Sequence, residues 1–478
     1  MWAVTGILFS AFCWYLSDGL NGDFWYLLWI APVPVLLISF RTNGTITFII
    51  SFIAYLLGRL SWFSYLAMVA TLVPAIIITL TVPLFFAIIM VITRRIVVKT
   101  GKWYSVFVFP VFFTAYEFLL MKFSADGTAG SIAYSQSNFL PVVQVASLTG
   151  LSGITFLLGL LPSFIATSWH FRKHNAAWLY FAGIPALILI AALLFGIFRL
   201  SSRVDQDFIK AGLVVLPEKS HFIADQADMQ KDIPVAEMYA GEIASLAAQG
   251  ADLVVLPERA VNVNKTLDTA IIKVFRQAAI QNHVFIVLGY TNTGGDQEYN
   301  SALILNKEGE TVADYNKVHL VTGFERQFTP GKETGLFNFR SKVAGVAICK
   351  DLDFQPHIRE YGKKMISFLC IPAWDFVKDD WLHSRMAIIR GVENGFSEIR
   401  CARKGRLTIS DCYGRVPFEA NASDGHKKQL LGEVSMHFTK TLYTRLGDWF
   451  GKTILIAALY LIYVMIRTWR REDLAQIP

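Results

Sequence analysis

The stretch KVAGVAICKDLDF, Lys342 to Phe354, decides how the second half of this chain is interpreted. Val and Ala dominate up to Cys349, and the sequence then turns polar at Lys350 and Asp351. A nearly continuous apolar run is typical of a strand that is covered on both faces. The pattern therefore predicts a buried strand whose end carries a single thiol to a charged edge of a sheet.

The composition points to a membrane protein. Hydrophobic residues make up 54% of the 478 residues, and the mean hydropathy is +0.43, values too apolar for an ordinary soluble protein. The apolar residues dominate residues 1–200, give way to a water-soluble α/β pattern over 201–449, and return after 450. We expect a seven-helix transmembrane bundle (1–200), a catalytic domain (201–449) and a C-terminal transmembrane helix with a cytoplasmic tail (450–478).

Eight apolar segments are candidate membrane spans, although several are shorter than the roughly 20 residues that a hydrocarbon core requires. The first lacks a basic n-region and a small-residue cleavage site, so we expect it to be an uncleaved span. The expected spans are Trp2–Leu16, Phe24–Phe40, Ile46–Tyr65, Leu72–Ile92, Tyr104–Met121, Val142–Ser168, Ala177–Phe198 and Phe450–Ile466.

Charges in the short loops predict the orientation. Ten Lys and Arg residues fall on one side of the expected spans, and Lys122 is the one base on the other side. Because basic loops stay in the cytoplasm, this bias predicts that both ends of the chain are cytoplasmic and that 201–449 is periplasmic. The ten residues are Arg41, Arg94, Arg95, Lys99, Lys102, Arg172, Lys173, Arg467, Arg470 and Arg471.

The soluble region alternates apolar runs with helical patterns, which predicts an α/β sandwich with much of its sheet buried. Helices are expected at Val235–Gln249, Leu267–Asn282 and Trp381–Gly395. Strands are expected at 211–217, 251–258, 284–290, 301–306, 343–349 and 365–373.

Three strand or loop ends carry reactive side chains: Glu258 in LVVLPE, Lys317 in YNKVHL and Cys349 in VAICKD. A thiol reacts as its thiolate, so it needs a base or a nearby positive charge. Glu258 is a candidate base, and Lys317 is a candidate for stabilising both the thiolate and a developing oxyanion. Each residue alone has an ordinary structural explanation, and their order along the chain is what favours a catalytic one.

Glu, Lys and Cys in this order and context resemble the nitrilase superfamily of carbon–nitrogen hydrolases. Glu325, in LVTGFE, is similar to an additional active-site glutamate of that superfamily, and FTPG at 328–331 also fits. The resemblance implies a four-layer α-β-β-α sandwich. It implies no metal and no organic cofactor.

The resemblance extends to one membrane-embedded branch, the apolipoprotein N-acyltransferase family. YSQSNFLPVVQVASLTGLSGITFL (Tyr134–Leu157), PAWDF (372–376), WLHSRMAIIRGVENG (381–395) and Arg400 are similar to it. Two motifs differ: Cys-Lys-Asp stands where that family usually has Cys-Tyr-Glu, and Leu-Pro-Glu-Arg where it usually has Trp-Pro-Glu-Thr.

This resemblance implies a transferase of the bacterial inner membrane. Cys349 would take an acyl chain from a membrane phospholipid as a thioester and pass it to the N-terminal α-amino group of a diacylglyceryl-modified apolipoprotein, with no nucleic acid involved. Glu258 would be the general base, Lys317 would stabilise the oxyanion, and Glu325 would position Lys317 or the incoming amine. Substrate contacts are expected from Lys350, Asp351, Trp374 and Trp381.

Two alternatives remain open at this point. One is a membrane-tethered amidase or nitrilase-type hydrolase that uses water as the acceptor. The other is a membrane transporter or binding protein whose soluble domain has lost catalysis, which predicts an inert Cys349.

Overall fold

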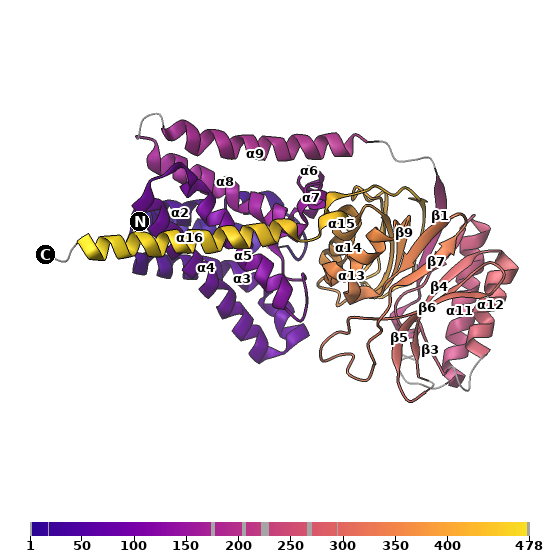
Figure 1. Cartoon of the computed structure of the whole chain (residues 1–478). Coiled ribbons are helices and arrows are strands. Elements are labelled where there is room, and N and C mark those ends of the chain that lie inside the picture. Colours follow the sequence, from indigo (N-terminus) through magenta and orange to yellow (C-terminus); the bar gives the residue numbers. More distant parts are fainter. Residues whose placement is uncertain are drawn as a thin grey trace. The chain divides into compact units, whose positions relative to one another are not determined.

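The computed structural model describes residues 2–17, 19–173, 177–202, 207–220, 229–264, 270–293 and 295–475. The chain divides into two compact units (Figure 1). The helical unit comprises 1–123, 130–200 and 448–478, and the sandwich unit comprises 124–129 and 201–447. The short loop 124–129 thus belongs to the sandwich unit although both of its flanks belong to the helical unit.

The helical unit is built from apolar helices joined by short turns. They are α1 (Trp2–Ser17), η1 (Trp25–Trp29), α2 (Val33–Ser39), α3 (Gly44–Ala70), α4 (Leu72–Thr100), η2 (Trp103–Phe107), α5 (Val108–Phe123), η3 (Ile132–Asn138), α6 (Leu140–Val143), α7 (Ala146–Thr149), α8 (Leu151–Phe171), α9 (Ala177–Leu200) and α16 (Trp449–Ala475). Many large apolar side chains on these helices face outward, as lipid-facing side chains do.

Among the described residues, six helices are long and apolar enough to cross a membrane. They correspond to the third to fifth and the last three of the predicted spans, and they are Gly44–Ala70, Leu72–Thr100, Trp103–Phe123, Leu151–Phe171, Ala182–Leu200 and Trp449–Arg467. The first two predicted spans fall on shorter apolar helices, Ala3–Ser17 and Trp25–Ser39. The chain is therefore a membrane protein.

Two predicted spans are wrong as single continuous helices. The second is divided into η1 and α2, and α2 begins after Pro32, which lacks the N–H that would continue a helix. The sixth, Val142–Ser168, is interrupted at Gly150, whose φ of +66° ends α7 before α8 begins. Glycine tolerates this backbone geometry and most residues do not.

The described strands of the sandwich unit form two sheets. The first has the order β13-β1-β2-β4-β5-β6 with β3 paired to β4, and the second has the order β12-β11-β10-β9-β8-β7. The strands are β1 (Phe208–Val215), β2 (Leu253–Val255), β3 (Val261–Val263), β4 (Phe285–Asn292), β5 (Tyr299–Leu305), β6 (Thr311–Asn316), β7 (Gly335–Phe339), β8 (Lys342–Val346), β9 (Phe368–Trp374), β10 (Ser397–Arg403), β11 (Arg406–Ser410), β12 (Phe418–Asn421) and β13 (Lys428–Ser435).

Alternating side chains on each strand bind the layers together. On β9, Phe368 and Cys370 join the core between the two sheets, whereas Leu369 and Ile371 pack toward the helices α13 (Gln355–Lys363) and α14 (Asp380–Asn394). The first sheet packs likewise on α11 (Met229–Ala248) and α12 (Ala270–Asn282). Figure 1 shows these two helix pairs on opposite sides of the sheets. The expected α-β-β-α sandwich is confirmed.

The predicted helices and strands of this unit are present with shifted ends, and the start of the helix predicted at Leu267–Asn282 lies outside the described residues. The sequence did not indicate β3, β6, β7 or β10–β13, which include most of the second sheet. Several of these strands are short or carry many polar residues, so their periodicity is weak.

Candidate active site

Cys349 does not end a strand, contrary to the prediction. Strand β8 ends at Val346, and Cys349 is the first residue of a short 3-10 helix, η4 (Cys349–Asp353), with φ of +42°. A non-glycine residue in this left-handed region is strained, and such strain is common at functional sites. All five cysteines lie in the described residues: Cys349 is partly exposed, and the other four are buried.

Asp351 fixes the turn that carries the thiol. One carboxylate oxygen accepts the Ile348 N–H at 3.0 Å and the Tyr315 hydroxyl at 2.7 Å. The other accepts the backbone N–H groups of Val318 and His319 at 3.2 and 2.8 Å. The side chain is fully buried, so this arrangement favours a positioning role rather than the substrate contact expected from the sequence.

Lys317 joins two carboxylates in the interior. Its Nζ atom lies 2.7 Å from Glu258 Oε1 and 2.9 Å from Glu325 Oε2, and all three side chains are at most 5% exposed. Asn300 Nδ2 donates to both carboxylates at 2.6 Å. The sequence analysis missed Asn300; the available signal was a polar residue at the start of the apolar run SALIL.

Two close backbone approaches position these side chains. A Cβ on Gly289 of β4 would lie 2.2 Å from the carbonyl oxygen of Pro257, next to Glu258. A Cβ on Gly331, in the FTPG motif, would lie 2.1 Å from the carbonyl oxygen of Asn316, next to Lys317. Only glycine permits contacts this short, so both positions bear directly on the geometry of the site.

The electrostatics assign different proton affinities to the two carboxylates. Burial raises the pKa of Glu258, and the charge of Lys317 only partly opposes this. Burial also acts on Glu325, but Lys317 and the Val321 N–H outweigh it and lower the pKa of that carboxyl group. Glu258 is therefore the better proton acceptor of the two.

The cation and the thiol respond to the same charges. Burial alone would lower the pKa of Lys317, yet Glu258, Glu325 and Cys349 outweigh it and raise that pKa well above the usual value. Burial raises the pKa of Cys349, and Glu258 raises it further while Lys317 opposes both. The resting thiol is thus protonated and needs a base at the moment of attack.

Trp374 borders the thiol. Its carbonyl oxygen lies 3.6 Å from Cys349 Sγ. Its ring faces the guanidinium carbons of Arg403 and Arg259, 3.9 and 5.2 Å from the ring centroid. Trp381, the other tryptophan predicted to contact substrate, is only 5% exposed and packs near Arg385.

A second buried ion group influences the thiol. Arg400 donates to both oxygens of Asp375, at 2.9 and 2.6 Å. Asp375 raises and Arg400 lowers the pKa of Cys349. His383 lies beside Asp375 and Asp379, and although burial lowers its pKa, these two carboxylates raise it to about 9. The sequence analysis quoted Arg400 but gave no role to Asp375 or His383.

Lys350 points away from this cluster. Its Nζ atom lies 2.5 Å from Asp126 Oδ1, in the loop 124–129, and its side chain is 7% exposed. The pairing partner expected from the sequence was Asp351 or a lipid phosphate, and the structure supplies Asp126 instead.

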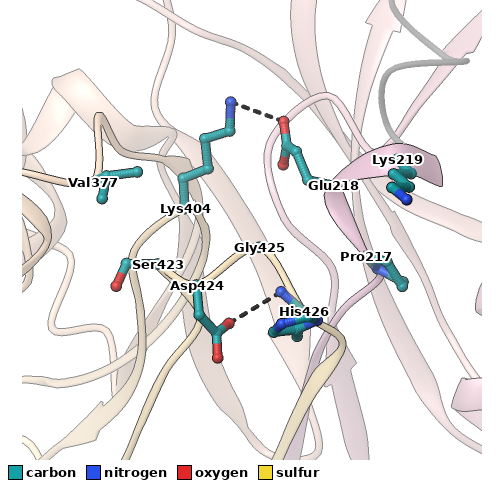
Figure 2. Close-up of a pocket in the computed structure, with 9 residues that line it drawn as sticks. All are labelled: Pro217, Glu218, Lys219, Val377, Lys404, Ser423, Asp424, Gly425 and His426. Atoms are coloured by element: carbon teal, nitrogen blue, oxygen red, sulfur yellow. Dashed lines mark hydrogen bonds and ion pairs between the residues drawn. The ribbon is translucent and has the colours of Figure 1, made fainter.

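Figure 2 shows a pocket of about 500 Å³ elsewhere on the sandwich unit, with the Lys404–Glu218 ion pair at its edge. Its lining residues are Pro217, Glu218, Lys219, Val377, Lys404, Ser423, Asp424, Gly425 and His426. None of the four predicted catalytic residues lines this pocket. Within the described parts of the chain, no group of three or more His, Cys, Asp or Glu side chains is arranged to hold a metal ion.

Comparisons with known proteins agree with this architecture. Residues 206–464 match the carbon-nitrogen hydrolase family, and residues 10–164 match the apolipoprotein N-acyltransferase N-terminal domain. An apolipoprotein N-acyltransferase from Geobacter metallireducens is 22% identical over 89% of this chain and 88% of that protein. One from Bradyrhizobium diazoefficiens is 24% identical over 72% of this chain and 70% of that protein.

Among solved structures, an amidase from Nesterenkonia sp. aligns with 53% of this chain and 99% of its own, at 16% identity and a TM-score of 0.42. The family matches cover both the soluble sandwich and most of the N-terminal helices. The chain therefore belongs to the carbon-nitrogen hydrolase family, as a divergent member of its membrane-embedded apolipoprotein N-acyltransferase branch.

Proposed function

We propose that this protein transfers an acyl chain from a membrane phospholipid to the N-terminal α-amino group of a diacylglyceryl-modified apolipoprotein. The observation that carries the proposal is the buried Glu258–Lys317–Glu325 group acting electrostatically on a partly exposed Cys349. The match of residues 10–164 to the N-terminal domain of the acyltransferases selects this reaction within the superfamily.

In the first half-reaction, Glu258 takes the proton of the Cys349 thiol as sulfur attacks the ester carbonyl carbon of the phospholipid. A carbon–sulfur bond forms, and the carbonyl oxygen becomes an oxyanion that the Lys317 ammonium stabilises. The carbon–oxygen bond of the ester then breaks, and Glu258 returns the proton to the departing lysophospholipid. The product is a thioester on Cys349.

In the second half-reaction, the α-amino group attacks the thioester. Glu258 removes a proton from the nitrogen, Lys317 again stabilises the oxyanion, and the carbon–sulfur bond breaks to regenerate the thiol. Glu325 keeps Lys317 in place through the 2.9 Å contact. Dividing one difficult transfer into two steps of moderate barrier is the usual advantage of covalent catalysis.

The proposal includes the orientation in the membrane. The basic bias of the short loops favours a bacterial inner membrane with residues 201–449 on the periplasmic side. A reporter that is active only in the cytoplasm, fused near Gly425, should then be silent. Reporter activity at this site would overturn the orientation without touching the chemistry.

The competing function is a membrane-tethered amidase-type hydrolase, in which water takes the place of the amine. The same four side chains would serve it, so the acceptor decides between the two. Purified full-length protein in vesicles of phospholipid, supplied with a diacylglyceryl-modified peptide, should yield N-acylated peptide. Release of free fatty acid with no amide product would favour the hydrolase.

The decisive test of the nucleophile is the mass of the intact protein after incubation with phospholipid. Wild type should carry an acyl adduct on Cys349, and Cys349→Ser should lose transfer, because Glu258 is too weak a base to activate an alcohol comparably. A correctly folded Cys349→Ala protein with wild-type activity would exclude the mechanism. Cys370→Ala is a matched control, because that thiol is fully buried between the sheets.

A further inference from the structure

The loop Ser124–Ala129 packs on the turn that carries the proposed nucleophile. Thr128 donates both its backbone N–H and its hydroxyl to the carbonyl oxygen of Asp353, at 3.0 and 2.8 Å. Asp353 is the last residue of η4, the helix that Cys349 begins. The Thr128 hydroxyl also accepts from Arg390 Nη2 at 3.4 Å, which ties the loop to α14.

Gly127 allows this close packing. Its φ is +52°, and a Cβ at this position would lie 2.5 Å from the carbonyl oxygen of Asp353. Both observations exclude a larger residue from the present geometry, since the backbone conformation disfavours side chains and the carbonyl oxygen occupies the space. The loop and η4 are therefore in direct backbone contact.

The loop also holds the residue that follows the nucleophile. Lys350 Nζ lies 2.5 Å from Asp126 Oδ1; the lysine side chain is 7% exposed, whereas the aspartate side chain is 64% exposed. A lysine this buried needs a partner for its charge, because an unpaired ammonium in a protein interior is costly. Asp126 supplies that partner from the solvent side.

From these contacts we infer that the loop Ser124–Ala129 positions Cys349 for attack, with Asp126, Gly127 and Thr128 as positioning residues at the start and end of η4. The inference rests on the proposed role of Cys349 and deepens it. Lys350 then has a structural task that the sequence did not suggest: it anchors the strained turn instead of contacting substrate.

The loop has a further consequence because it directly follows α5, which ends at Phe123. Six residues therefore separate the nucleophile-anchoring contacts from a candidate membrane span. Through this covalent connection, the reactivity of Cys349 depends on a segment that sequence comparison would assign to the membrane region.

The first test measures alkylation of Cys349 by iodoacetamide in the purified full-length protein, quantified on the Cys349 peptide by mass spectrometry. Gly127→Ala should lower the rate at least tenfold. Gly130→Ala is the matched control, because a Cβ there meets nothing within 4 Å, and it should react at the wild-type rate. A folded Gly127→Ala protein that reacts at the wild-type rate would overturn the inference.

The second test uses the ion pair and remains decisive if Gly127→Ala fails to fold. Asp126→Asn leaves Lys350 buried without its partner and should lower both the alkylation rate and the kcat for thioester formation tenfold or more. Lys350→Met in the same protein should restore at least part of this loss. Three variants, the two single and the double, that all react like wild type would refute the role of the pair.

Two readouts separate positioning from a general loss of structure. Asp126→Asn should reduce kcat while leaving the KM for phospholipid within about twofold and the melting temperature unchanged. A fall in melting temperature with kcat unchanged would show that the loop is merely structural. Because iodoacetamide replaces the lipid, a wild-type rate in Asp126→Asn would count against the loop even if Cys349→Ala establishes the proposed function.

Discussion

Asn300 donates its side-chain amide to a carboxylate oxygen of Glu258 across 2.6 Å, and the same nitrogen lies 2.6 Å from Glu325. Lys317 bridges these carboxylates with a positive charge, and Asn300 bridges them with a neutral donor. The two carboxylates thus remain close together without a second cation. This arrangement leaves Glu258 with a raised pKa, as a base for a thiol requires.

Asn300→Ala should slow thioester formation on Cys349 by about 10- to 100-fold, because a buried hydrogen bond to a charged group contributes roughly 1.5–3 kcal/mol. The measurement is single-turnover acylation with phospholipid vesicles. Asn282→Ala is the control, since Asn282 donates to the Ala278 carbonyl at the end of α12, outside the site. Equal rates for the two variants would remove Asn300 from the machinery.

Glu325→Gln should move the acid limb of the pH–rate profile to lower pH. The negative charge of Glu325 raises the pKa of Glu258, so a neutral glutamine lets Glu258 stay deprotonated in more acidic solution. The profile of the thioester-forming rate between pH 4 and 9 tests this, with the exposed Glu333→Gln as control. A shift of the limb to higher pH would contradict the assignment of Glu258 as base.

Asp353→Asn should stabilise the protein at neutral pH and have little effect near pH 4. Burial raises the pKa of Asp353 to about 6, from an ordinary value of 3.8. Between these values the folded state binds more protons than the unfolded state, so the free energy of unfolding falls as pH rises, by up to about 3 kcal/mol. Asparagine removes this penalty.

The melting temperature of the Asp353→Asn protein, measured at pH 4 and at pH 7.5, checks the sign. The gain over wild type should be larger at pH 7.5. The exposed Asp296→Asn serves as control and should give the same small difference at both pH values. A gain confined to pH 4 would mean that the Asp353 carboxylate is stabilising in its charged form.

Gly331→Ala should abolish acylation of Cys349 because its Cβ would displace the backbone that carries Lys317. Gly241→Ala is the contrasting variant: it lies on α11 with nothing within 4 Å of the added Cβ and should stabilise that helix by about 1 kcal/mol. Activity and melting temperature of both variants test the pair. An active Gly331→Ala protein would show that the FTPG turn tolerates rearrangement.

The sequence indicated the fold class because apolar patterning is local. The run around Leu253 and the run ending near Val346 had the composition of doubly covered strands, and both are strands between two layers. The long spans α3 and α4 were equally evident from length and hydropathy. By contrast, most of the second sheet was missed, since edge strands such as β12 are short and only partly buried.

The chain order of Glu258, Lys317 and Cys349, with its motifs, was sufficient on its own to identify the family and to nominate these side chains. Only the tertiary structure decided which other groups meet them. Asn300 joins Glu258 through pairing of β5 with β4, and Asp126 reaches Lys350 across 224 positions of sequence. Local patterns report which residues are buried, whereas contacts between distant segments depend on how the layers pack, and a single sequence does not record that packing.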